Sequence, residues 1–135
     1  MEKLILRRNA LAKALKTLEN SLAKLDQKTF TDYQELRDSI IQRFEYSVDI
    51  FWKYLKDHLR VVLGVNIEIA RPKFVLKECY DAKLLSKEEF EVCINLIEDR
   101  NLTSHGYNEN LAEKISKNIP KYFQCMKLIS ERLCI

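Results

Sequence analysis

Apolar residues recur every three or four positions along almost the whole chain, with few residues that would break a helix. The 135 residues include only two glycines and two prolines, and no alternation of apolar and polar residues is long enough for a strand. Spacings of three and four place side chains on one face of a helix, whereas a strand repeats every two residues. The sequence therefore predicts an all-α fold, an up-and-down bundle of four or five helices, with residues 1–135 forming a single domain.

Turn and capping residues divide this pattern into five helices. Ser86 with Glu89, and Thr31 with Gln34, have the spacing of a capping box, which opens a helix. Pro120 falls inside the last apolar repeat, and its missing amide predicts a kink or a restart of the helix there. The expected helices cover residues 2–25, 32–63, 72–83, 86 to about 105, and 108 to the C-terminus.

The second expected helix has apolar residues on two faces. One stripe runs from Tyr33 through Phe44 to Val62 and is expected to face the core. The other stripe lies about 160° away around the helix. It consists of Tyr46, Ile50, Tyr54 and Val61. A helix that is apolar on two sides is buried on both or packs against another chain, so we expect a homodimer.

Charge and cysteine content limit the classes of function. Lysine and arginine total 23 against 20 aspartates and glutamates, and this net charge of +3 neither requires nor excludes nucleic acid. The four cysteines form no C-x-x-C pair and the two histidines lie far apart, so neither a metal site nor a cofactor is expected. The chain starts with an amphipathic helix rather than an apolar leader, and no apolar run could span a bilayer. A cytoplasmic protein without membrane contact is therefore expected.

The stretch from Arg100 to Tyr107 carries the clearest chemistry. It places Arg100, His105 and Tyr107 at the end of the fourth expected helix, with Asn101 directly after the arginine. A guanidinium binds phosphate oxygens through two parallel hydrogen bonds, and an imidazole exchanges a proton near neutral pH. Together these two groups are enough to cleave RNA beside a 2′-hydroxyl without a metal. Arg100 and His105 are therefore the candidate catalytic residues, and Asn101 is placed to support them.

A plainer interpretation of the same residues stays open. An arginine at such a position commonly pairs with a nearby carboxylate, here Asp99 or Glu98. A histidine at the end of a helix is commonly a solvated residue without a function. The pattern of one arginine and one histidine therefore does not by itself establish an active site.

Basic residues on the second expected helix also have two interpretations. Arg43 and Lys53 lie about 80° apart around the helix and are placed to extend a basic groove toward Arg100. Nearby acidic residues favour a solvated surface instead. That interpretation covers four side chains, Arg37, Arg43, Lys53 and Lys56. His58, on the same helix, is expected to be exposed or to cap the helix end.

The Arg-x4-His-x-Tyr pattern resembles the motif of the HEPN domains, and the branch that pairs with small nucleotidyltransferases is the most similar. The resemblance extends to residues 32–38, 41–46 and 52–56 and covers nearly the whole chain. It implies a homodimeric helical bundle whose partner is a minimal nucleotidyltransferase encoded nearby. In toxin-like HepT members it implies a metal-independent endoribonuclease that acts on RNA. The partner silences that ribonuclease by attaching AMP to the motif tyrosine, here Tyr107.

Two other functions are consistent with the same resemblance. Members of this branch named for substrate binding imply a non-catalytic subunit that completes a two-component nucleotidyltransferase and binds its nucleotide or other substrate. A dimeric scaffold that keeps the motif only for packing is the third interpretation. Whether the chain is itself an enzyme therefore stays open at the level of sequence.

Overall fold

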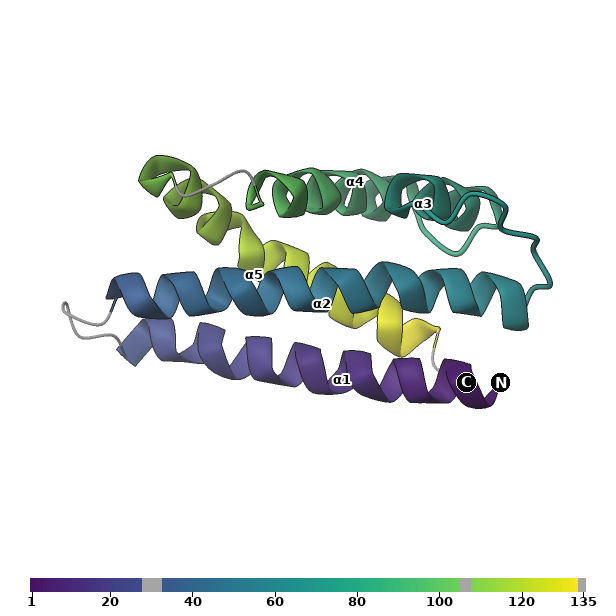
Figure 1. The fold of residues 1–135 in the computed structure, drawn as a ribbon, viewed down its shortest axis with the longest axis horizontal. Coiled ribbons are helices and arrows are strands. Elements are labelled where there is room, and N and C mark those ends of the chain that lie inside the picture. The colour runs from purple at the N-terminus through teal and green to yellow at the C-terminus, as the bar shows by residue number, and fades with distance from the viewer. Residues whose placement is uncertain (28–32, 105–107, 134–135) are drawn as a thin grey trace.

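The computed structural model describes residues 1–27, 33–104 and 108–133, and it confirms an all-α fold (Figure 1). Five α-helices and one 3-10 turn make up the described elements. No strand occurs among the described residues. The elements are α1 (Glu2–Ala23), η1 (Lys24–Gln27), α2 (Tyr33–Val61), α3 (Pro72–Asp81), α4 (Lys87–Leu102) and α5 (Glu109–Arg132). The five expected helices are therefore all present.

Helix α2 is the central element of the bundle, and each of the other four helices contacts it. Figure 1 shows α1 antiparallel to α2 on one side and the α3 and α4 pair on the other, while α5 crosses α2 obliquely. One stripe of α2 lies in the core, with every member fully buried: Ile40, Phe44, Val48, Phe51, Leu55 and Leu59. These residues are the middle of the core stripe expected from the sequence, whereas Tyr33 at its start is half-buried and Val62 at its end is 42% exposed. Burial of such a stripe is the main source of stability in a helical bundle.

Two helix starts follow the capping residues in the sequence. The Ser86 hydroxyl accepts a hydrogen bond from the Glu89 amide at 3.1 Å, and the Glu89 carboxylate accepts one from the Ser86 amide at 2.9 Å. Both bonds of the predicted capping box are thus present. Asn108 caps α5 in the same manner, because its side-chain oxygen accepts from the Leu111 amide at 3.0 Å. The other predicted box includes Thr31, which lies outside the described residues.

Pro120 does not restart the last helix. Helix α5 runs unbroken from Glu109 to Arg132 and contains the proline in its interior. Pro120 is exposed, while Ile119 on one side and Phe123 on the other are buried in the core. The missing amide removes one hydrogen bond of the helix. Burial of the apolar face on both sides of the proline outweighs that loss. The apolar spacing alone could not show whether the helix would continue through the proline.

Arg132 fixes the end of α5 to the start of α4. Its guanidinium donates to both carboxylate oxygens of Glu89, at 2.8 and 2.9 Å, and to the Leu84 carbonyl at 2.8 Å. The Glu89 carboxylate has a lowered pKa because of the hydrogen bond from Arg132. The two helices are therefore joined by charge at this point as well as by apolar packing.

The second apolar stripe of α2 is not continuous. Tyr46 is 62% exposed and Val61 is 42% exposed, whereas Tyr54 is completely buried in the core. The Tyr54 hydroxyl donates to the Leu133 carbonyl at 3.3 Å. The homodimer expected from this stripe stays a prediction, and Tyr54 no longer contributes to it. Among the described residues, no helix is long and apolar enough to cross a membrane.

The cysteines of the described chain behave as small buried groups. Cys79 and Cys93 are buried and Cys125 is half-buried, and all three are free thiols. Burial raises the pKa of the Cys79 thiol to about 12. Such a thiol stays protonated at neutral pH and is a poor nucleophile. Cys134 lies outside the described residues.

His58 lies in the last turn of α2 but is buried, so its expected exposure at the surface is wrong. Only 5% of it is exposed, its ring lies 6.2 Å from that of Tyr54, and its Nδ1 has no hydrogen-bond partner among the described residues. Desolvation lowers its pKa below the ordinary value of 6.5. The imidazole is therefore neutral in the folded protein at neutral pH.

Acidification is expected to destabilise the fold through His58. Because the pKa of His58 is lowered by folding, the unfolded chain binds the proton first. The contribution of neutral His58 to the free energy of unfolding is fully present above the pKa of histidine in the unfolded chain, about 6.5. It decreases as the pH falls from that value toward the lower pKa of the folded protein. Urea unfolding on both sides of the unfolded-chain pKa measures the loss, and His58→Gln should reduce it. An unchanged pH dependence in His58→Gln would contradict this assignment.

Candidate functional site

Arg100, the predicted phosphate-binding residue, lies in the last turn of α4 and is directed at α2. Its Nε and one terminal nitrogen each lie 3.2 Å from an oxygen of Asp49, and its other terminal nitrogen lies 3.2 Å from Glu45. The contact with Asp49 is bidentate, which is the strongest geometry for this type of pair. Arg100 thus holds the end of α4 against the middle of α2.

These partners differ from the predicted ones. The sequence offered Asp99 or Glu98, but the side chains that bind Arg100 come from α2, more than fifty positions earlier. Thr103 completes the cluster, because its hydroxyl donates to the same Glu45 oxygen at 2.8 Å. Arg100 and Thr103 lie three positions apart, which places them on one helix face. The hydrogen bond to Asp49 raises the pKa of Arg100, so its charge is permanent.

The charge of Arg100 is balanced within the protein itself. Its side chain is 23% exposed, and those of Glu45 and Asp49 are 27% and 46% exposed. Two carboxylates therefore compete directly with any phosphate group for the same guanidinium. A phosphate can bind Arg100 in the bidentate geometry only where it displaces Asp49. The arrangement described here is that of an ion pair between helices.

Asp99, next to Arg100, binds α5 instead of the arginine. It accepts hydrogen bonds from the Tyr122 hydroxyl at 2.6 Å and from the Asn118 amide at 3.5 Å. Burial and this bond to Asp99 together raise the pKa of Tyr122. The Tyr122 ring is stacked on Phe44 of α2, with 5.7 Å between ring centroids. Neighbouring residues of α4 thus bind two different helices, which fixes the orientation of the whole turn.

A pocket of about 310 Å³ lies where α2, the end of α4 and the start of α5 meet. It is mostly apolar, with three polar side chains at its edge. The lining residues are Asp38, Ile41, Leu102, Thr103, Asn108, Leu111, Ala112 and Ile115. Small-molecule sites of about 300–1,000 Å³ typically have this mixture of an apolar lining and a few polar groups. Thr103 belongs to both the pocket and the Arg100 cluster, so the two features are contiguous.

The remaining motif residues are placed as follows. Asn101 is exposed on α4. His105, Gly106 and Tyr107 lie outside the described residues. The pocket residues Thr103 and Asn108 precede and follow this segment closely in the sequence. The roles of His105 as a catalytic residue and of Tyr107 as an AMP acceptor therefore stay predictions.

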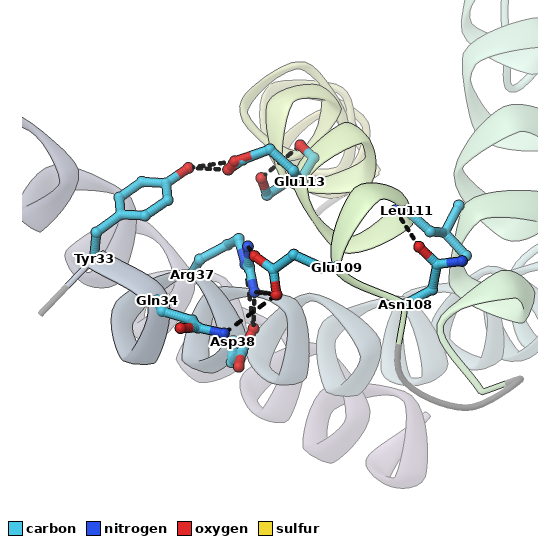
Figure 2. A network of polar contacts seen from close by, with 9 residues as sticks. Tyr33, Gln34, Arg37, Asp38, Asn108, Glu109, Leu111 and Glu113 are labelled. Carbon is cyan, nitrogen blue, oxygen red and sulfur yellow. Dashed lines mark hydrogen bonds and ion pairs between the residues drawn. The ribbon is translucent and has the colours of Figure 1, made fainter.

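Arg37 forms a second charged cluster at the start of α5 (Figure 2). Its side chain is only 2% exposed, so its expected place on a solvated surface is wrong. The guanidinium is ion-paired with Glu109, with a second contact to the same carboxylate at 3.1 Å, and it donates to Asp38 at 3.1 and 3.2 Å. Beside it, the Tyr33 hydroxyl donates to the Glu113 carboxylate. Asp38 thus lines the pocket with its charge already balanced.

The basic groove expected to extend from Arg43 and Lys53 toward Arg100 stays a prediction. Arg43 lies in a hollow between α1 and α2, together with Lys13. The Lys53 ammonium lies 5.9 Å from the centre of the Trp52 ring instead. The sequence did not indicate that Lys13 lies beside Arg43, because the two residues belong to different helices. Among the described residues, no group of three or more His, Cys, Asp or Glu side chains could hold a metal ion.

The chain is similar to known proteins both in sequence and in structure. The family model described as "Nucleotidyltransferase substrate binding protein like" matches residues 6–134. A protein from Thermus thermophilus, known from its crystal structure, is 38% identical and superimposes with a TM-score of 0.80. That similarity covers 93% of this chain and 99% of the Thermus chain. No curated protein matches the chain at a significant level.

Proposed function

Because the chain belongs to the family of nucleotidyltransferase substrate-binding-like proteins, we propose that it is the substrate-binding subunit of a two-component nucleotidyltransferase. The observation that carries this proposal is the pocket between α2, α4 and α5. It is formed by the same helix ends that carry the Arg100 motif, and it is large enough for a small ligand. The partner is a nucleotidyltransferase encoded beside this chain, which supplies the catalytic groups.

The state of Arg100 supports binding over cleavage. A ribonuclease needs its guanidinium free to neutralise the developing charge on phosphorus. Here that group is bound by Asp49 and Glu45, and it holds α4 against α2. Arg100 and Thr103 both bind Glu45, and Thr103 lines the pocket. Arg100 therefore helps to hold this side of the pocket in place.

Co-expression with the neighbouring nucleotidyltransferase tests the proposal. We expect the two proteins to co-purify and the complex to transfer a nucleotide to its substrate. Ala112→Leu adds bulk inside the pocket and should lower that transfer about tenfold or more while the complex stays intact. Asn110→Ala, an exposed change two positions earlier, is the matched control. Absence of a complex, or full transfer by Ala112→Leu, would contradict the subunit role.

A HEPN-type endoribonuclease is the second candidate function. It is favoured by one observation, the partly exposed guanidinium of Arg100 five positions before His105. The same preparations decide between the two functions. A ribonuclease requires that Arg100→Ala and His105→Ala each lower RNA cleavage about 100-fold or more. Equal behaviour of wild type and both variants would exclude it. If the partner silences the ribonuclease, incubation with the partner and ATP should raise the mass of this chain by one AMP. The Tyr107→Phe variant should show no such gain.

A further inference from the structure

A groove of about 560 Å³ runs along the seam between α1 and α2 and shares no lining residue with the pocket described above. Four residues of each helix line it. They are Ala10, Lys13, Ala14 and Thr17 of α1, and Ser39, Gln42, Arg43 and Tyr46 of α2. In each helix the four residues follow the spacing of three, four and seven positions that defines one face. The groove is therefore formed by two complete helix faces lying side by side.

Side-chain size explains why this seam is hollow. Ala14 is buried at the floor, and Ala10 and Ser39 are half-buried beside it. Since these three side chains are short, they leave the space between the helices open. The longer side chains of Lys13, Gln42, Arg43 and Tyr46 stand at its edges and are all exposed.

The groove carries positive charge that the protein does not neutralise. Lys13 and Arg43 line it, and none of its eight lining residues is acidic. Neither cation forms an ion pair in the described part of the chain. Arg7, Arg37 and Arg100 differ in this respect, because each of them is paired with at least one carboxylate. Two unbalanced cations at one groove favour an anionic ligand, and an arginine favours phosphate in particular.

Tyr46 adds an aromatic surface at the same place. It is 62% exposed, so its ring is accessible from solvent. A flat ring at this site can stack on the base of a nucleotide. The Thr17 hydroxyl donates to the Ala14 carbonyl at 2.8 Å, which leaves its oxygen lone pairs available as acceptors. Gln42 offers both donors and an acceptor.

From these features we propose that the groove between α1 and α2 binds a nucleoside phosphate. Arg43 and Lys13 hold the phosphate oxygens, Tyr46 stacks on the base, and Gln42 and Thr17 provide polar contacts to the base or sugar. The volume suits a ligand of this size. This site is separate from the pocket of the proposed substrate-binding role, so either assignment can fail without the other.

Titration of the purified chain with ATP, tripolyphosphate and adenosine tests the site, with calorimetry as the readout. ATP should bind most tightly, and Arg43→Glu and Lys13→Glu should each weaken it about tenfold or more. Tyr46→Ala should weaken ATP and leave tripolyphosphate unchanged, because only ATP has a base to stack. Lys53→Glu is the matched control, since Lys53 is an exposed cation of α2 outside the groove. Helical content and urea unfolding of each variant show that the fold is intact.

Several results would overturn the proposal. One is equal binding of ATP by wild type and Arg43→Glu, and another is no binding of ATP at millimolar concentration. Equal affinity for ATP and tripolyphosphate, unaffected by Tyr46→Ala, would show a plain anion site without base recognition. Binding of single-stranded RNA without any binding of mononucleotides would show that the groove serves a longer strand instead.

Discussion

Phe44→Ala is expected to lower the free energy of unfolding by about 3–5 kcal/mol, the usual cost of removing a buried aromatic ring. Phe44 is fully buried in the middle of α2, the helix that every other helix contacts. Its ring stacks on Tyr122 of α5. The variant therefore loses the burial of the ring, leaves a cavity, and weakens the contact between two helices.

Urea unfolding of the purified variant measures this loss. A loss of this size is a large part of the free energy of unfolding of an ordinary domain, which is about 5–15 kcal/mol. Gln42→Ala changes an exposed residue two positions away and should alter stability by no more than about 0.5 kcal/mol. A loss of less than about 1 kcal/mol in Phe44→Ala would show that the site can collapse around the missing ring.

Glu109→Ala is expected to lower the free energy of unfolding by about 2–3 kcal/mol, because it removes a partner of a buried charge. The Arg37 guanidinium is 2% exposed and would keep Asp38, the other carboxylate bonded to it in Figure 2. Glu109 itself is 54% exposed, so the estimate lies below the full cost of breaking a buried pair. Asn110→Ala, at the next position, should change stability little.

The double variant Arg37→Met/Glu109→Ala separates charge from packing. Methionine fills much of the volume of the arginine stem without its charge, so no unpaired cation remains. We expect the double variant to be more stable than Glu109→Ala alone. Urea unfolding of the single and double variants gives the comparison. Equal or lower stability of the double variant would show that the arginine contributes through its remaining hydrogen bonds.

The helices were predictable because local rules determine them. The starts at Ser86 and Asn108 depend on side chains within three positions of the helix end, and the structure has both caps. Helix α2 ends at Val61, two residues before the expected end, and Gly64 follows with a positive φ of 65°. Glycine adopts that conformation without steric cost, which suits the residue that follows the end of a helix. The spacing of apolar residues could not predict that α5 would continue through Pro120, because that continuity depends on packing against other helices.

The charged contacts were not predictable from local sequence. Arg100 has two acidic neighbours in the chain, yet it binds Asp49 and Glu45 of a different helix. Arg37 has Asp38 beside it, and its other carboxylate, Glu109, lies 72 positions away. Such partners depend on which faces of two helices meet, and the sequence of either helix alone does not contain that information.

One clue to Arg37 was present in the sequence. It lies four positions after Tyr33 and seven before Phe44, on the same face of α2 as the core residues. A charged residue on an apolar face needs a partner of opposite charge when it is buried. Its position relative to the stripe was therefore more informative than the acidic residues around it. Arg43 lies six positions later and faces the seam with α1, where it stays exposed.

Helix α5 has an arginine contact near each of its ends. Arg37 of α2 binds Glu109 in its first turn, and its own Arg132 binds Glu89 of α4 in its last turn. Helices ordinarily lose their order from the termini inward, one turn at a time. In α5 both termini are anchored to different neighbours, so gradual fraying is opposed at either side. Detachment of this helix should therefore be an all-or-none event that opens the pocket in the same step.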